Sequence, residues 1–278
     1  PIPSRGLGDV YKRQLFMQGN YFDIGVNLTH ESFNSDYRVV INDAILNNIK
    51  KICLTGTSIE DSKKCIEIAN EFKKNLICTV GIHPHNACYF DESSNNKILE
   101  LIKSPLVKAI GEAGLDFNRN FSNKEDQINC FINQIKIAND SNLPLFLHQR
   151  DAHDTFMECI LKEKIKGKAI VHCFTGSINE LYDYLDNNLF IGITGWVCDP
   201  KRGKNLESII PEIPINKLLI ETDSPYLLPK SLKVKNRRNE PSFLPVIFDK
   251  IANLRKEPRE ELKHQIYENS VNFFNLSE

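Results

Sequence analysis

Histidine and carboxylate side chains close several of the apolar runs in this sequence. The runs LPLFLH and AIVH end in His148 and His172, and the runs VKAIGE and LLIETD end in Glu112 and Asp223. A lone histidine after a strand is more often a hydrogen-bonded structural residue, and a carboxylate there is often a helix cap. Two carboxylates and two imidazoles that meet at one edge are instead suited to a divalent Mg, Mn or Zn ion.

Such a site would perform hydrolysis. A divalent ion lowers the pKa of bound water from about 15.7 towards about 7 and polarises a phosphoryl or carbonyl oxygen. In such a site Glu112 is suited to bridging two ions, and Asp223 is suited to accepting the proton of the water and orienting it. Both roles are hypotheses from position and residue type.

Other polar side chains near these runs are candidates for substrate contacts. Arg119 and Arg150 each lie within a few residues of a predicted ligand, and guanidinium groups match phosphate oxygens. His83 and His85 flank Pro84, so they either orient the scissile phosphate or hydrogen-bond to the backbone of a tight turn.

Aromatic side chains occur on the same predicted loops. Stacking a base on such a ring contributes about 1–3 kcal/mol whatever the base, although packing of each ring explains its presence equally well. The candidates are Trp196, with Phe117, Phe174 and Tyr226.

Two basic runs follow the last two predicted strands. Residues 230–238 (KSLKVKNRR) contain five basic side chains, and residues 201–204 contain three. Such runs are usually solvated loops. Here they would also form a local basic rim that could follow a phosphate backbone.

Short β-rich runs alternate with helical patterns from residue 21 to the C-terminus. Helical periodicity is clear at residues 60–72 and 124–139. Eight strands with intervening helices predict an α/β fold with an all-parallel sheet, of the size of a (β/α)8 TIM-type barrel in a single domain. A doubly wound open sheet is the alternative, but no GxGxxG turn follows the first strand. The expected strands are residues 21–26, 51–55, 76–80, 107–111, 145–148, 169–172, 190–194 and 218–221.

Composition limits the class of protein. The 278 residues are 41% hydrophobic and 26% charged, with a formal net charge of -1, so a uniformly basic nucleic-acid binder is excluded. Eight scattered cysteines without a CxxC pair argue against a disulfide framework and favour reduced thiols in the cytoplasm. The sequence suggests no membrane segment and no obligate protein partner, so we expect a monomer.

The first residues are set apart from this pattern. Residues 4–14 (SRGLGDVYKRQ) match, codon by codon, a sequencing-library adapter, so we expect residues 1–14 to be a disordered artefact of library preparation. The barrel would then occupy residues 15–278 as one domain.

Several motifs in order resemble the TatD-related DNase family of metal-dependent hydrolases. They are DIGVNL (23–28), VGIHPH (80–85), IGEAGLDFNRNFS (110–122), FLHQRDAH (146–153), VHCFTG (171–176), GITGWVCDPKRG (192–203), LLIETDSPYLLP (218–229) and RRNEP (237–241).

The resemblance implies an amidohydrolase-type barrel that hydrolyses phosphodiesters. It implies Glu112, His148 and His172 as metal ligands, and Asp223 as a further ligand and the catalytic acid or base. In one branch of the family the implied activity is a Mg-dependent 3′–5′ exonuclease on single-stranded DNA and RNA, which would serve DNA repair or degradation. Many members have an HxH pair on the first strand, where this chain has Gly25 and Asn27.

Two other functions fit the same residues. One is metal-dependent hydrolysis of an ester or amide on a nucleotide or aminoacyl-tRNA, which would use the same metal chemistry with a different substrate pocket. The other is a non-catalytic barrel, which loss of several ligands would indicate. All four main ligands are present.

Overall fold

The computed structural model describes residues 20–234 and 237–277. The artefact predicted at residues 1–14 lies outside the described residues. Within them, eight strands form one sheet in the order of the sequence, and each strand runs parallel to its neighbour. The strands are β1 (Tyr21–Val26), β2 (Ile49–Leu54), β3 (Leu76–Val80), β4 (Val107–Asp116), β5 (Leu145–Arg150), β6 (Ala169–Val171), β7 (Phe190–Ile193) and β8 (Leu218–Ile220).

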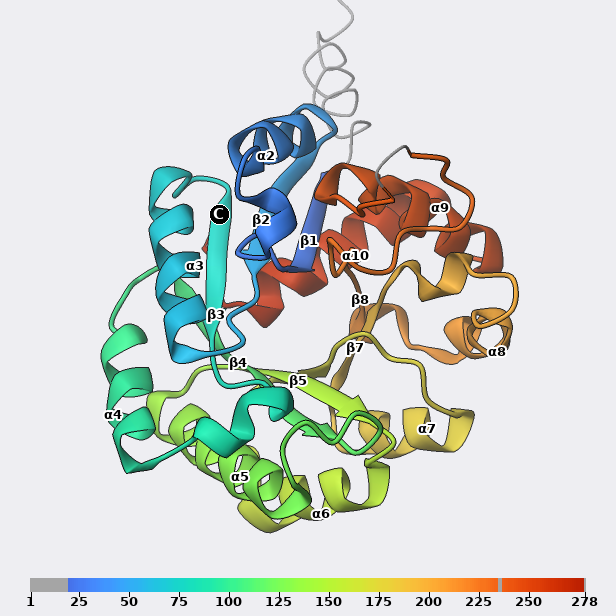
Figure 1. Cartoon of the computed structure of the whole chain (residues 1–278). Coiled ribbons are helices and arrows are strands. Elements are labelled where there is room, and N and C mark those ends of the chain that lie inside the picture. Colours follow the sequence, from blue (N-terminus) through green and yellow to red (C-terminus); the bar gives the residue numbers. More distant parts are fainter. Residues whose placement is uncertain (1–19, 235–236, 278) are drawn as a thin grey trace, which may run out of the picture.

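Helices connect the strands and surround them (Figure 1). Parallel neighbours require such crossovers, which place each helix outside the sheet. The helices are α2 (Tyr37–Leu46), α3 (Ile59–Glu71), α4 (Glu92–Leu101), α5 (Lys124–Ser141), α6 (His153–Glu163), α7 (Ile178–Asp186), α8 (Lys204–Ile209), α9 (Leu244–Leu254) and α10 (Arg259–Phe273).

The last strand meets the first, so the sheet closes into a barrel. Val26 and Ser224 form a parallel bridge. The backbone N–H of Asn27 donates to the Ser224 carbonyl over 2.8 Å, and that of Asp223 donates to the Gly25 carbonyl over 2.9 Å. The predicted (β/α)8 barrel is therefore confirmed.

The fourth strand is longer than its sequence suggests. We expected it to end at Gly111, but β4 continues to Asp116 after a register shift against β5. Gly111 and Gly114 have φ values of +145° and +143°, which side-chain-bearing residues rarely adopt. A Cβ at Gly114 would lie 1.9 Å from the His148 carbonyl oxygen. Glycine usually interrupts a strand. At these two positions, however, the absence of a Cβ allows β4 to approach β5.

Apolar side chains fill the barrel at its amino-terminal end. Phe22 of β1 stacks on Phe274 with ring centroids 5.4 Å apart, and Phe190 of β7 meets Phe273 edge-on at 5.5 Å. The end of α10 therefore closes this end of the barrel, and the opposite end is left for polar side chains. In the described part of the chain, we find no helix that is both long and apolar enough to cross a membrane.

Candidate metal centre

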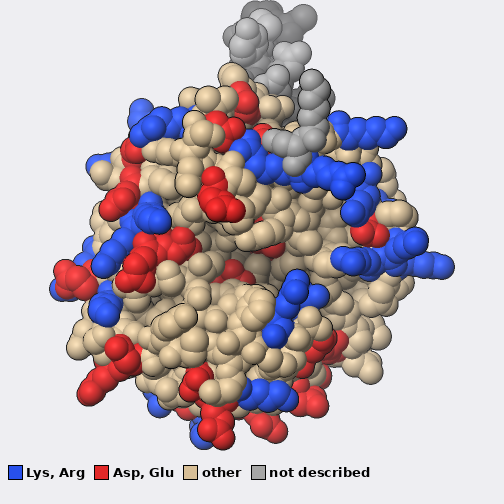
Figure 2. Space-filling view, viewed as in Figure 1, with Lys and Arg blue, Asp and Glu red and all other residues tan. Residues whose placement is uncertain are grey.

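The polar side chains at the carboxyl ends of the strands surround one cavity of about 730 Å³. Figure 2 shows the corresponding hollow at the centre of this face. Parallel strands of a barrel direct their carboxyl ends to the same rim, which is why residues distant in sequence meet there. All of the predicted site residues line this cavity: His83, His85, Glu112, Arg119, His148, Arg150, His172, Trp196 and Asp223.

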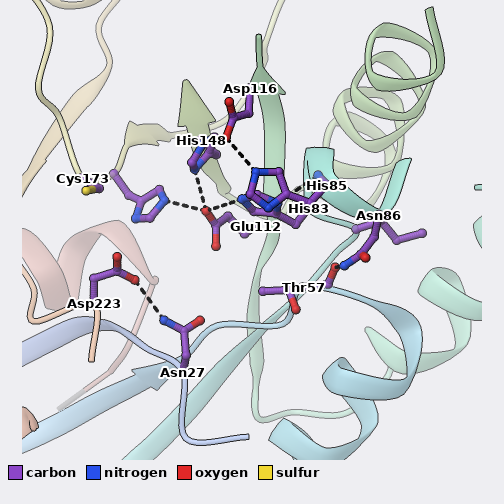
Figure 3. Close-up of polar contacts among 12 residues, drawn as sticks. Asn27, Thr57, His83, His85, Asn86, Glu112, Asp116, His148, Cys173 and Asp223 are labelled. Atoms are coloured by element: carbon purple, nitrogen blue, oxygen red, sulfur yellow. Dashed lines mark hydrogen bonds and ion pairs between the residues drawn. The ribbon is translucent and has the colours of Figure 1, made fainter. Parts of the chain in front are cut away.

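Glu112 is the centre of the site (Figure 3). Its Oε1 atom lies 2.8 Å from Nε2 of His172, 2.9 Å from Nδ1 of His148 and 3.2 Å from Nε2 of His83. Glu112 lies on β4 and His148 lies on β5. His172 directly follows β6, and His83 lies shortly after β3. Four neighbouring strands therefore contribute one side chain each.

Burial and mutual charge set the protonation of this group. Burial opposes ionisation of Glu112, but the nearby charges of His172 and His83 and the hydrogen bonds from His148 and His172 hold its pKa well below the usual value. Burial alone would lower the pKa of His172, yet Glu112 and Glu221 raise it well above the usual value. Burial lowers the pKa of His83 to about 4, which keeps this imidazole neutral at neutral pH.

The donor set fits a divalent ion. Ligand atoms of His83, Glu112 and His148 all lie within 4.8 Å of one another. In addition, the buried Nε2 atom of His148 has no hydrogen-bond partner among the described residues, because Asp116 Oδ2 is 3.6 Å away. A buried polar atom without a partner is costly. Imidazole groups suit Zn, and carboxylate groups suit Mg and Mn, so this mixed donor set fits a divalent ion.

Asp223 faces the site from the opposite side of the cavity, after β8 (Figure 3). Its Oδ1 accepts a 2.9 Å hydrogen bond from the side-chain amide of Asn27. Burial, with the charges of Glu112 and Glu221, raises the pKa of Asp223 to about 7, although His172 opposes the shift. A carboxyl group with this pKa can accept or release a proton near neutrality.

Glu221 is a buried carboxylate of the site that the sequence did not single out. Its Oε1 accepts a 2.7 Å hydrogen bond from the backbone of Cys173, and its Oε2 lies 3.4 Å from Nδ1 of His172. A Cβ at Gly25 would lie 2.2 Å from this Oε2. Glu221 therefore occupies the space that any side chain at position 25 would need. The sequence feature that could have identified Glu221 is a charged residue at the end of an apolar strand.

A second carboxylate–histidine pair lies beside Glu112. Nε2 of His85 is 2.7 Å from Oδ2 of Asp116, the last residue of β4 (Figure 3). Asp116 also accepts a 2.8 Å hydrogen bond from the backbone N–H of Arg119. Arg150 pairs with Asp116 in the ladder between β4 and β5. These contacts place both arginines on the rim of the cavity, with their side chains exposed.

The aromatic candidates divide into two groups. Trp196 and Tyr226 line the cavity, and Tyr226 is 50% exposed. Phe174, by contrast, is 3% exposed, and Phe117 packs against the core without lining this cavity. Trp196 also packs against the core while it lines the cavity. The guanidinium of Arg202 lies over the Trp196 ring, 5.0 Å from its centroid.

A closed (β/α)8 barrel with carboxylates and imidazoles gathered at the carboxyl ends of its strands defines a metal-dependent hydrolase. The family model described as TatD related DNase matches residues 22–275. The chain therefore belongs to the TatD-related DNase family, and the family and the hydrolytic nuclease class expected from the motifs are confirmed.

Named relatives agree along nearly the whole chain. The 3′-5′ ssDNA/RNA exonuclease TatD of Escherichia coli (strain K12) is 45% identical over 240 residues, which cover 85% of this chain and 92% of that protein. The protein of the same name from Yersinia pseudotuberculosis is 45% identical over 259 residues, which cover 92% and 99%. A solved structure, the hydrolase TatD family protein from Entamoeba histolytica, superposes with a TM-score of 0.84 at 29% identity, covering 92% of this chain and 98% of that one.

Proposed function

We propose that this protein is a metal-dependent 3′–5′ exonuclease that hydrolyses phosphodiester bonds of single-stranded DNA and RNA. The observation that carries the proposal is the contact of one Glu112 oxygen with three imidazole groups in a cavity bordered by arginines. The names of the two bacterial relatives supply the substrate and the direction. DNA repair or degradation in the cytoplasm is the setting that fits this activity.

The proposed ligands are Glu112, His148, His172 and Asp223. We extend this set to His83, which we expected to contact substrate, because its Nε2 atom lies 3.2 Å from the same Glu112 oxygen. His85 then orients the site through Asp116 or contacts the phosphate from the rim. We propose Mg as the ion because position 25 offers no ligand atom and the Asn27 amide bonds to Asp223, which favours a loosely held ion.

Hydrolysis requires a nucleophile, a proton acceptor and a held phosphate. A divalent ion bound here would supply acidification of water and polarisation of the phosphoryl oxygen. Asp223 accepts the proton of the attacking water, and Asn27 holds the carboxylate in place through its amide. Arg119 and Arg150 bind the phosphate oxygens from the rim. Trp196 stacks a base beside them.

The test is a time course on single-stranded DNA labelled at its 3′ or its 5′ end, with Mg, Mn or EDTA. We expect ordered loss of nucleotides from the 3′ end with Mg, no loss in EDTA, and none from Glu112→Ala. A wild-type protein that loads a divalent ion and leaves every such DNA intact would overturn the proposal in favour of another ester or amide substrate.

The domain organisation is also part of the proposal. We propose that the barrel is the one domain of residues 15–278, since the described residues form a single closed sheet with its surrounding helices. Limited proteolysis followed by mass spectrometry tests this arrangement. A stable fragment that ends within the barrel would contradict it.

A further inference from the structure

A second cavity lies between the segments that follow β7 and β8, and it borders the cavity of the metal centre. Its volume is about 760 Å³, and it shares Trp196, Arg202 and Leu227 with the cavity that holds Glu112 and Asp223. The two cavities are therefore adjacent along these three residues.

Positive charge is concentrated along this cavity. Among the described residues, its charged lining consists of four cations, Arg202, Lys230, Lys233 and Arg237, and one carboxylate, Asp199. The whole chain has a net charge of -1, so this excess is local. Figure 2 shows basic side chains along the upper and right-hand border of the central hollow, whereas acidic side chains are more frequent on the opposite border. We call this cavity the basic groove.

Asp199, the carboxylate among the described lining residues of the basic groove, already accepts hydrogen bonds. Oδ1 of Asp199 accepts hydrogen bonds from the backbone N–H groups of Lys201 at 2.9 Å and Arg202 at 3.0 Å. These bonds, with the charges of Lys230 and Arg202, lower the pKa of Asp199. Asp199 therefore stabilises the loop after β7 and offsets part of the positive charge, but the described lining residues of the groove keep an excess of cations.

The floor of the basic groove is well defined. A Cβ at Gly195 would lie 2.1 Å from the Leu227 carbonyl oxygen, so the segments after β7 and β8 are in direct backbone contact there. Half-buried apolar residues, including Leu228 and Leu232, line the groove between its cations. An apolar floor with a basic border suits a strand that presents bases on one side and phosphates on the other.

The other cavity beside the metal centre has a different character. Its volume is about 460 Å³, and its charged lining groups besides the histidines are balanced: Arg150 and Arg202 against Asp151 and Glu180. This cavity is smaller and has no excess of cations among its described lining residues, so the basic groove is better suited to several phosphates.

We propose that the basic groove binds the part of a single-stranded DNA or RNA that lies on the 5′ side of the scissile phosphate, with Arg202, Lys230 and Lys233 contacting successive phosphates. This inference rests on the proposed 3′–5′ exonuclease activity. Hydrolysis from the 3′ end removes one nucleotide and leaves the remaining strand attached upstream, so only that side needs several cations. Trp196, at the junction of the cavities, stacks the base next to the scissile bond.

The test compares a long and a short substrate in the double variant Lys230→Ala/Lys233→Ala. We expect the ratio of the KM for a 12-mer to the KM for a dinucleotide to rise about tenfold. The dependence of 12-mer binding on salt should weaken by about 1.4 in log–log slope, since each phosphate contact with a single strand contributes about 0.7. The matched control Lys73→Ala/Lys166→Ala removes two exposed lysines near the amino-terminal ends of strands and should change neither quantity.

Neutral methylphosphonate linkages assign the direction of the strand. Placed at the second to fourth phosphates from the 3′ end of the 12-mer, they should raise KM for the wild-type protein and have little further effect in the double variant. Linkages near the 5′ end should have little effect in either protein. An equal effect at both ends would overturn the proposed direction.

The experiments distinguish an error in the proposed strand binding by the basic groove from an error in the proposed exonuclease activity. If the wild type degrades DNA but the double variant keeps the same KM ratio and salt slope, the basic groove is wrong and the exonuclease stands. Fluorescence anisotropy of a labelled 12-mer in EDTA measures binding without hydrolysis. If the wild type cleaves no DNA but the double variant loses this binding, the groove stands as a polynucleotide site and the exonuclease proposal falls.

Discussion

Glu112 contacts three imidazole groups. These contacts show which features of the site can be predicted from residue types at the ends of strands and which cannot. The sequence predicts the side chains that line the cavity because any polar residue after a barrel strand points to the same rim. It does not predict that His83 contacts Glu112, because that contact depends on how β4 is staggered against its neighbours. The sequence also does not distinguish the roles of Glu221 and Asp223 in the site, because the two residues are only two positions apart.

Glu221 should control the affinity for the ion without binding it. Its carboxylate is fully buried and lies 3.4 Å from Nδ1 of His172, so it directs the other ring nitrogen towards Glu112. Loss of such a partner usually weakens metal binding about 10–100-fold. We expect this loss for Glu221→Gln, measured as the dissociation constant of Mn²⁺.

The control for this prediction is Glu158→Gln, on the exposed face of α6. This variant should bind Mn²⁺ with the dissociation constant of the wild-type protein. An unchanged Mn²⁺ constant in Glu221→Gln, with a normal circular dichroism spectrum, would show that His172 needs no such partner.

At the scale of elements, β4 determines the geometry of the centre. The alternation of strands and helices is readable from periodicity, and most predicted strand ends lie within one or two residues of the observed ones. The length of β4 is not readable, because glycines weaken the interior of a strand and often mark a bulge or a tight bend. Only the close approach of β5 explains them.

Gly114→Ala tests the approach of β4 to β5. The new Cβ would lie 1.9 Å from the His148 carbonyl oxygen, and the φ value of +143° is strained for alanine. We expect the free energy of unfolding to fall by about 1–3 kcal/mol, measured by urea denaturation. Metal content should fall as well, since His148 has to move.

Gly167→Ala is the matched control for this substitution. The nearest atom to its new Cβ would be the Leu143 carbonyl oxygen at 3.6 Å, an ordinary contact. Its stability and metal content should stay close to those of the wild type. Equal effects of the two substitutions would show that the contact between β4 and β5 is not the cause.

At the scale of the whole molecule, ion binding and stability are linked. An ion that binds only the folded state at about 100 times its dissociation constant stabilises it by about 2.7 kcal/mol, or about 5 °C or more in Tm for a protein of this size. Ligands must lose their protons first. Burial raises the pKa of Asp223 to about 7, and although burial alone would lower the pKa of His172, Glu112 and Glu221 raise it well above the usual value.

The increase in Tm caused by Mn²⁺ should therefore depend on pH. Protons compete with the ion below about pH 7, so the increase should be larger at pH 8 than at pH 6, measured by differential scanning calorimetry at fixed Mn²⁺. Glu112→Ala should show little increase at either pH. The same increase at both values in the wild type would contradict the proposed ligands.

The packing of Phe273 and Phe274 against Phe190 and Phe22 has a consequence for biosynthesis. These aromatic contacts join the first and last elements of the described chain, so the ribosome must translate both before the barrel interior can exclude water. Until then, apolar faces of the early strands remain exposed on the nascent polypeptide. The barrel interior can therefore close only after α10 has been translated, and in the interval the nascent chain exposes surfaces that chaperones bind.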